Sequence, residues 1–258
     1  MEERLKQRVN PSQAALIVID VQNDFCHDEG TFGKIGQDLR DIQKMVPRLI
    51  DFVEEARRAR VPIIWVRVEH GPWTNSESWL YREHVRGQPI CVEGSWGAEY
   101  YLVKPQAGER EVIKHRYSAF ADTDLALILR SRGIRTILVT GVATNVCCES
   151  TAREGFMKDY HVVFVEDCNA TTSRAEHEAT LVNIRKFFGV CPPLNPARTI
   201  LPCPAPHGPW RASGGPPPTR DPAVSACPGK RVVLHLIRFG STHLATASPH
   251  GAEPQEGR

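Results

Sequence analysis

Two hydrophobic patterns alternate along the first 190 residues of the chain. Short, continuous apolar runs at Ala14–Ile19 and Thr136–Gly141 are typical of strands buried on both faces of a parallel sheet. Further strand-like segments lie at 61–68, 110–115 and 161–166. Between these runs, apolar residues recur every three or four positions and predict helices over 39–56, 125–129 and 181–188.

Strands that alternate with helices predict an α/β fold, a three-layer, doubly wound (Rossmann-like), mostly parallel sheet of five or six strands. The sixth, at the edge, is predicted at Ala197–Leu201. Residues 69–109 form the longest irregular stretch and contain several Trp and Gly residues. Because active-site lids usually come from long loops, we expect this stretch to cover the ligand-binding crevice.

The C-terminal segment has a different composition. From Cys191 onward the chain holds 14 of its 20 prolines and shows little hydrophobic periodicity. Such a segment cannot bury enough apolar surface to offset the entropy of ordering, so we predict a domain over 12–202 and a disordered tail over 203–258. A strand-like patch at Val232–Ile237 is the exception. An alternative or out-of-frame terminus and a proline-rich interaction tail both remain open.

Composition narrows the class of protein. The net charge is +2, from 32 basic and 30 acidic residues, and no basic stripe is present, which disfavours nucleic acid as a partner. No apolar run approaches the length of a membrane span, and the charged N-terminus lacks a signal-peptide core. The eight cysteines show neither paired CxxC nor zinc-ligand spacing. We expect a cytoplasmic protein in a reducing compartment.

The segment Gly141–Cys148 places a thiol where a buried strand gives way to a helix, which we expect to begin near Asn145. Free backbone N–H groups and the helix dipole at that point favour the thiolate, which makes Cys147 a candidate nucleophile. Cys148 shares a helical face with Ala152 and Phe156 and is assigned to the core. A free cysteine is more often a small buried hydrophobe, so Cys147 alone does not decide the question.

Two charged residues strengthen the case for Cys147. Asp20 follows the strand-like run at 14–19, and Lys114 ends the segment at 110–115. Each has an ordinary explanation, since such an aspartate usually caps a turn and such a lysine is usually solvated. However, ligands bind beyond the carboxyl ends of parallel strands, and all three side chains fall on that edge.

Three segments resemble, in order and spacing, the signatures of the isochorismatase-like cysteine hydrolases. They are Ile19–Phe25, Lys114–Phe120 and Gly141–Cys147, and the resemblance extends from about residue 12 to about residue 190. Within that superfamily, the segments around Gly94, Tyr117 and Asn145 are most similar to the ureidoacrylate amidohydrolase branch.

The resemblance implies a catalytic triad of Asp20, Lys114 and Cys147 and a cis peptide bond between Val142 and Ala143. It also implies an oxyanion hole formed by the backbone N–H groups of Ala143 and Cys147. In such a site Asp20 acts as general base, Lys114 supplies positive charge, and the thiol attacks an amide or ureido carbonyl to form a thioester. No cofactor is implied.

Nicotinamidases, which belong to the same superfamily, carry an Asp-x-His metal cluster after the second strand. The corresponding stretch here reads Arg67-Val-Glu-His70, so we predict no metal, although Glu69 and His70 together would hold one weakly. Asp167, after the fifth predicted strand, is expected to cap a helix. The candidate substrate contacts are Asn23, Phe25, His70, Trp73, Trp79 and Tyr117. For each tryptophan, structural packing is the competing explanation.

The leading functional hypothesis is a cysteine amidohydrolase that cleaves a C–N bond of a small amide or ureido compound, with ureidoacrylate-like molecules preferred. Hydrolysis of N-carbamoyl amino acids or nicotinamide is the alternative within enzymes. A non-catalytic binding module of the same fold, with its proline-rich tail recruiting a partner, is the alternative of another class. A homo-oligomer is expected, because the family is commonly oligomeric.

Overall fold

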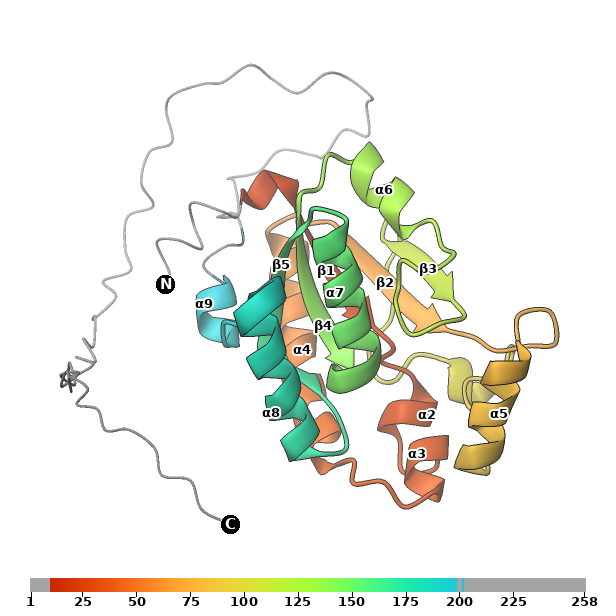
Figure 1. Ribbon diagram of the computed structural model, residues 1–258. Coiled ribbons are helices and arrows are strands. Elements are labelled where there is room, and N and C mark those ends of the chain that lie inside the picture. The colour runs from red at the N-terminus through yellow and green to blue at the C-terminus, as the bar shows by residue number, and fades with distance from the viewer. Residues whose placement is uncertain (1–9, 199–200, 202–258) are drawn as a thin grey trace, which may run out of the picture. The chain divides into compact units, whose positions relative to one another are not determined.

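The computed structural model describes residues 10–198 and residue 201. Its centre is a six-stranded sheet in which every described pairing is parallel and the strand order is β3-β2-β1-β4-β5-β6 (Figure 1). The strands are β1 (Ala14–Ile19), β2 (Ile63–Val68), β3 (Arg110–Lys114), β4 (Thr136–Val142), β5 (His161–Ala170) and β6 (Gly189–Val190). This architecture confirms the predicted parallel α/β fold.

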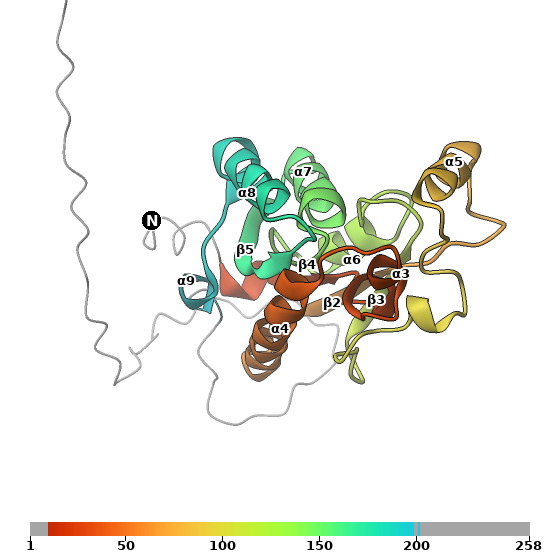
Figure 2. The ribbon, with the colours of Figure 1, turned by 90° about the horizontal axis from the view of Figure 1, so that it is seen from below.

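Helices cover both faces of the sheet, and the side chains of β1 alternate between two hydrophobic clusters. Leu16 belongs to the cluster that contains residues of α4, whereas Ile17 belongs to the cluster that contains residues of α6, α7 and α8. Figure 2 shows α4 on the face of the sheet opposite to α7 and α8. The longer helices are α4 (Arg40–Arg58), α5 (Glu77–Arg86), α6 (Leu125–Ser131), α7 (Glu149–Met157) and α8 (Arg174–Asn183). The short ones are α2 (Asn23–Cys26), α3 (Thr31–Lys34) and α9 (Leu194–Arg198).

Short single turns complete the described part of the chain. The 3₁₀ turns are η1 (Pro11–Gln13) and η2 (Trp96–Ala98), and the π-helical turns are η3 (Thr144–Cys148) and η4 (Ile184–Phe188). No helix in the described ranges is long and apolar enough to cross a membrane.

The sixth strand is not the predicted one. The edge strand is β6, and residues 197–198 of the predicted strand belong instead to helix α9 (Leu194–Arg198). Leu194 and Ala197 of this helix are buried in the α4-side cluster. Asp167 lies inside β5, not after the fifth strand, and Ser173 caps the helix that follows; the Asp167 carboxylate instead accepts the N–H of Leu194, the first residue of α9, at 2.6 Å. Residues 199–200 lie outside the described part of the chain.

The stretch 69–109 is more ordered than its sequence indicated, because it contains α5 and η2. The Ser76 hydroxyl accepts the Trp79 N–H at the start of α5, and Gly87 ends the helix in the left-handed region with φ 79°. Figures 1 and 2 place α5 at one side of the sheet, apart from the helices that pack on its faces. The predictions for 203–258, including the patch at Val232–Ile237, fall outside the described residues.

Candidate active site

The three predicted catalytic side chains come from the carboxyl ends of three strands. Asp20 directly follows β1, Lys114 is the last residue of β3, and Cys147 lies in η3, just after β4. Asp20 adopts a left-handed backbone conformation, with φ 51°. Gly141 lets β4 approach β1 closely at this point, because a Cβ atom there would lie 2.0 Å from the Ile19 carbonyl oxygen.

The structure brings these three side chains together. Lys114 Nζ lies 2.8 Å from Asp20 Oδ2 and donates a hydrogen bond to Cys147 Sγ at 3.4 Å. It also donates to the Arg116 carbonyl oxygen at 3.0 Å, which fixes the ammonium group between its partners. Asp20 and Lys114 are completely buried, and Cys147 is 6% exposed. A carboxylate, an ammonium group and a thiol therefore share one enclosed space.

Burial dominates the electrostatics of this cluster. It raises the pKa of Asp20, and the Lys114 ammonium and the Cys147 hydrogen bond partly oppose that rise. Burial and the Asp20 carboxylate raise the pKa of Cys147 to about 12, against the effect of Lys114. The expectation that Cys147 favours the thiolate is not met, because desolvation raises the pKa of its thiol. Ionising Cys147 requires a proton acceptor, and Asp20 is adjacent.

The turn η3 orients the nucleophile candidate. The peptide bond between Val142 and Ala143 is cis, and the Ala143 carbonyl oxygen accepts the Val146 and Cys148 N–H groups at 3.1 and 3.2 Å. Helical structure thus begins at Thr144, one residue before the predicted start. Cys148 is fully buried in the core, as predicted. Phe156 does not share that environment, since 47% of it is exposed, and it packs instead against Phe188.

A cavity of about 150 Å³ opens onto this cluster. Four of the six predicted substrate contacts line it, namely Phe25, His70, Trp79 and Tyr117. Lys114, Cys147 and Ala143 also line it, which places the candidate oxyanion-hole residues at the cavity wall. The remaining lining residues, not singled out in the sequence, are Phe32, Val68, Arg82, Arg86, Ile90 and Val146.

Two predicted contacts do not line this cavity. Asn23 is buried, and its side-chain amide donates to the Trp96 carbonyl oxygen at 2.8 Å, so it holds the loop instead of facing the cavity. Trp73 is 98% exposed. Its position in a turn before α5 directs the ring outward. The missed arginines carry a sequence signal, because Trp79, Arg82 and Arg86 are spaced to share one face of a helix.

His70 is the most unusual polar residue of the cavity wall. It is 2% exposed, its ring stacks on Trp79 with centroids 4.0 Å apart, and neither ring nitrogen has a hydrogen-bond partner among the described residues. Burial and the nearby Lys114 lower the pKa of His70 to about 3. The neutral ring therefore presents one donor and one acceptor without a protein partner.

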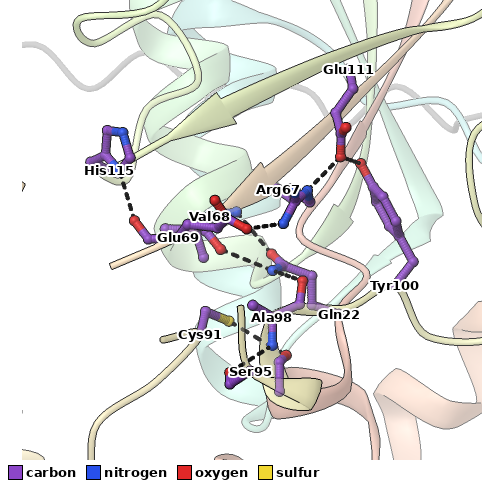
Figure 3. A network of polar contacts seen from close by, with 11 residues as sticks. Gln22, Arg67, Val68, Glu69, Cys91, Ser95, Ala98, Tyr100, Glu111 and His115 are labelled. Carbon is purple, nitrogen blue, oxygen red and sulfur yellow. Dashed lines mark hydrogen bonds and ion pairs between the residues drawn. The ribbon is translucent and has the colours of Figure 1, made fainter. Parts of the chain in front are cut away.

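A buried glutamine connects the loops that shape this region (Figure 3). The Gln22 side-chain amide donates to the carbonyl oxygens of Val68 and Ala98 at 2.9 and 2.8 Å, and its oxygen accepts the Val68 N–H at 2.9 Å. Figure 3 also shows Arg67 between Glu69 and Glu111, with the Tyr100 hydroxyl donating to Glu111. Glu69 is thus engaged by Arg67. No cluster of three possible metal ligands occurs within 10–198 and 201.

Comparison with known proteins places this site in a family. The model of the isochorismatase domain matches residues 14–192. The chain belongs to the isochorismatase family. It is 36% identical to the ureidoacrylate amidohydrolase of Klebsiella pneumoniae subsp. pneumoniae, over 74% of this chain and 90% of that protein. The family assignment and the parallel α/β fold agree with the three motifs that carried the resemblance.

Solved structures of other hydrolases share the fold. A cysteine hydrolase from Pseudomonas syringae pv. phaseolicola superposes with a TM-score of 0.67 at 28% identity, covering 75% of this chain and 94% of the other. The N-carbamoylsarcosine amidase of Thermoplasma acidophilum gives a TM-score of 0.58 at 26% identity, covering 70% and 95% of the two chains. A cysteine hydrolase and an N-carbamoylsarcosine amidase are therefore among the structural relatives of this chain.

Proposed function

We propose that the protein is a cysteine amidohydrolase that cleaves the C–N bond of a small ureido or amide compound, with ureidoacrylate-like substrates preferred. One observation carries the proposal: Lys114 joins the Asp20 carboxylate and the Cys147 thiol at the floor of a cavity. The similarity to a ureidoacrylate amidohydrolase supports the choice of substrate class. The cavity, at about 150 Å³, suits a small molecule.

In the first half-reaction, the Cys147 proton moves to Asp20 and the sulfur attacks the substrate carbonyl carbon. The raised pKa of Asp20 suits a proton acceptor in this step. Lys114 stabilises the sulfur anion, and the backbone N–H groups of Ala143 and Cys147 receive the developing oxyanion. The C–N bond then breaks as Asp20 returns its proton to the departing nitrogen, which leaves a thioester.

The second half-reaction releases the acid. Asp20, now ionised again, takes a proton from a water molecule, and the resulting hydroxide attacks the thioester carbonyl carbon. The C–S bond breaks, the sulfur recovers its proton from Asp20, and the carboxylic or carbamic acid product leaves. Water is consumed and an amine or ammonia is formed, so that no redox partner is needed.

Release of ammonia from a panel of amides, ureides and N-carbamoyl compounds tests this proposal. We expect turnover of at least one ureido compound and its loss in Asp20→Ala and in Cys147→Ser. Alkylation by iodoacetamide with peptide mapping provides a second readout, in which Cys147 reacts before the other thiols. Absence of turnover across the panel would reject the hydrolase and favour a binding module. Near-normal turnover in Cys147→Ser would instead reject Cys147 as the nucleophile.

A second candidate activity is hydrolysis of N-carbamoyl amino acids. The structural similarity to N-carbamoylsarcosine amidase supports it, and the chemistry at Cys147 would be the same. The same panel distinguishes the two activities. A higher kcat/KM for N-carbamoyl amino acids than for ureidoacrylate-like compounds would favour this second candidate.

A further inference from the structure

The active-site cavity is lined by two arginines that form no ion pair within the described part of the chain. Arg82 and Arg86 both line the cavity from α5. Together with Trp79 they fall at helical spacings of three and four residues, so the three side chains share the face of α5 that is directed to the cavity. The helix therefore presents two guanidinium groups next to an aromatic ring.

Neither guanidinium group has an acidic partner within the described part of the chain. The one hydrogen bond of Arg86 goes to the Gln88 carbonyl oxygen, at 3.4 Å, and neither arginine takes part in a described ion pair. Glu83, on the same helix, accepts the Trp79 indole N–H at 3.3 Å and does not line the cavity. Lys114, the third cation of the lining, is paired with Asp20.

The surroundings make that charge costly to leave unpaired. Most of the other lining residues are apolar, and none of the residues that line the cavity is acidic. Arg86 is half-buried, and desolvation lowers its pKa, an effect that Tyr117 and Glu83 partly oppose and Arg82 strengthens. An anion bound between the two guanidinium groups would be held by charge-assisted hydrogen bonds in an environment of low dielectric constant.

His70 provides independent evidence for a polar ligand in this cavity. Its buried ring nitrogens lack protein partners, as described above, and it lies on the same wall, stacked on Trp79. The two arginines suit the anionic group of a ligand, and the neutral histidine can form hydrogen bonds with an uncharged amide or ureido group of the same ligand.

We propose that Arg82 and Arg86 form a carboxylate-binding subsite in the cavity that Cys147 also lines, so that the protein selects amide or ureido substrates that carry a carboxylate in addition to the scissile bond. This inference rests on the proposed function for the identity of the reacting group. The subsite itself is inferred from the two arginines and the apolar lining of the cavity. It can therefore be tested by binding measurements, without turnover.

The test compares ureidoacrylate with its methyl ester, in which an uncharged methoxycarbonyl group replaces the carboxylate. Binding of both is measured by calorimetry in a Cys147→Ala background, where no turnover occurs. We expect the acid to bind at least about tenfold more tightly than the ester, since one charge-assisted hydrogen bond is worth that much. In Arg86→Gln and in Arg82→Gln/Arg86→Gln the advantage should fall towards one, whereas Arg86→Lys should retain part of it.

Arg58→Gln is the matched control, because Arg58 is an exposed arginine of α4 that does not line the cavity. Equal affinity for acid and ester in the parent, no binding of either, or an advantage that survives in Arg82→Gln/Arg86→Gln would overturn the subsite. Failure of the proposed function looks different: the protein with Cys147 intact would turn over no amide, while the preference for the acid in binding would persist.

Discussion

Lys114 Nζ lies 2.8 Å from Asp20 Oδ2, and both side chains are completely buried. Removing one member of such a pair leaves an uncompensated charge in the interior. We therefore expect Lys114→Met to abolish activity and to lower the free energy of unfolding by about 3–5 kcal/mol, measured by denaturant titration.

The double variant Asp20→Asn/Lys114→Met provides the control for that prediction. Because it removes both charges, it should be more stable than the sum of the two single changes predicts, and it should remain inactive. Strictly additive losses of stability would show that the two groups do not interact in the folded protein.

The two adjacent cysteines should respond differently to substitution. Cys147→Ala should lower kcat by several orders of magnitude with little loss of stability, because its sulfur lines the cavity. Cys148→Ala should leave kcat within a few-fold of the parent and lower the free energy of unfolding by about 1–2 kcal/mol, because Cys148 is fully enclosed by the core. Steady-state kinetics and thermal unfolding distinguish the two roles, and a reversed pattern would exchange them.

The acid limb of the pH–rate profile should belong to Asp20. Burial raises the pKa of this group, and protonation removes the acceptor for the Cys147 proton, so kcat/KM should fall as the pH falls through that pKa. His70, with a pKa lowered to about 3, stays neutral over the working range. His70→Gln should reduce kcat/KM without moving the limb, and a displacement of about one pH unit would assign the limb to His70 instead.

Gln22 should matter for stability, not for chemistry. Its side chain satisfies buried backbone groups of Val68 and Ala98 (Figure 3), and Gln22→Leu would leave them without partners. We expect a loss of about 2–4 kcal/mol in the free energy of unfolding, since each buried unsatisfied group costs about 1–3 kcal/mol. The exposed Gln37→Leu is the control and should change stability by less than about 0.5 kcal/mol.

The sequence predicted the sheet and the reactive cluster because both depend on local patterns. The apolar run at 14–19 coincides with β1, and the positions of Asp20, Lys114 and Cys147 at strand ends were sufficient to expect their meeting. The edge of the sheet was not predictable in the same way. Residues 194–198 are helical because Leu194 and Ala197 pack on the core and Asp167 caps the turn, and these are tertiary contacts.

The cavity wall shows the same limit. Trp73 and Trp79 look alike in the sequence, yet Trp73 is exposed and Trp79 is buried against His70. Which of two aromatic residues faces a cavity depends on where α5 begins, and that start is set by the Ser76 cap. Arg82 and Arg86 were overlooked because arginines on a helix are usually solvated.

The residues proposed for catalysis and the two arginines proposed for carboxylate binding come from separate parts of the chain. Asp20, Lys114 and Cys147 follow strands of the central sheet, whereas α5 belongs to the connection between β2 and β3. Sequence changes in that connection would therefore alter the substrate specificity, while the three residues proposed for catalysis stay the same. A fold of this kind can acquire new substrate specificities through changes in a single connecting segment.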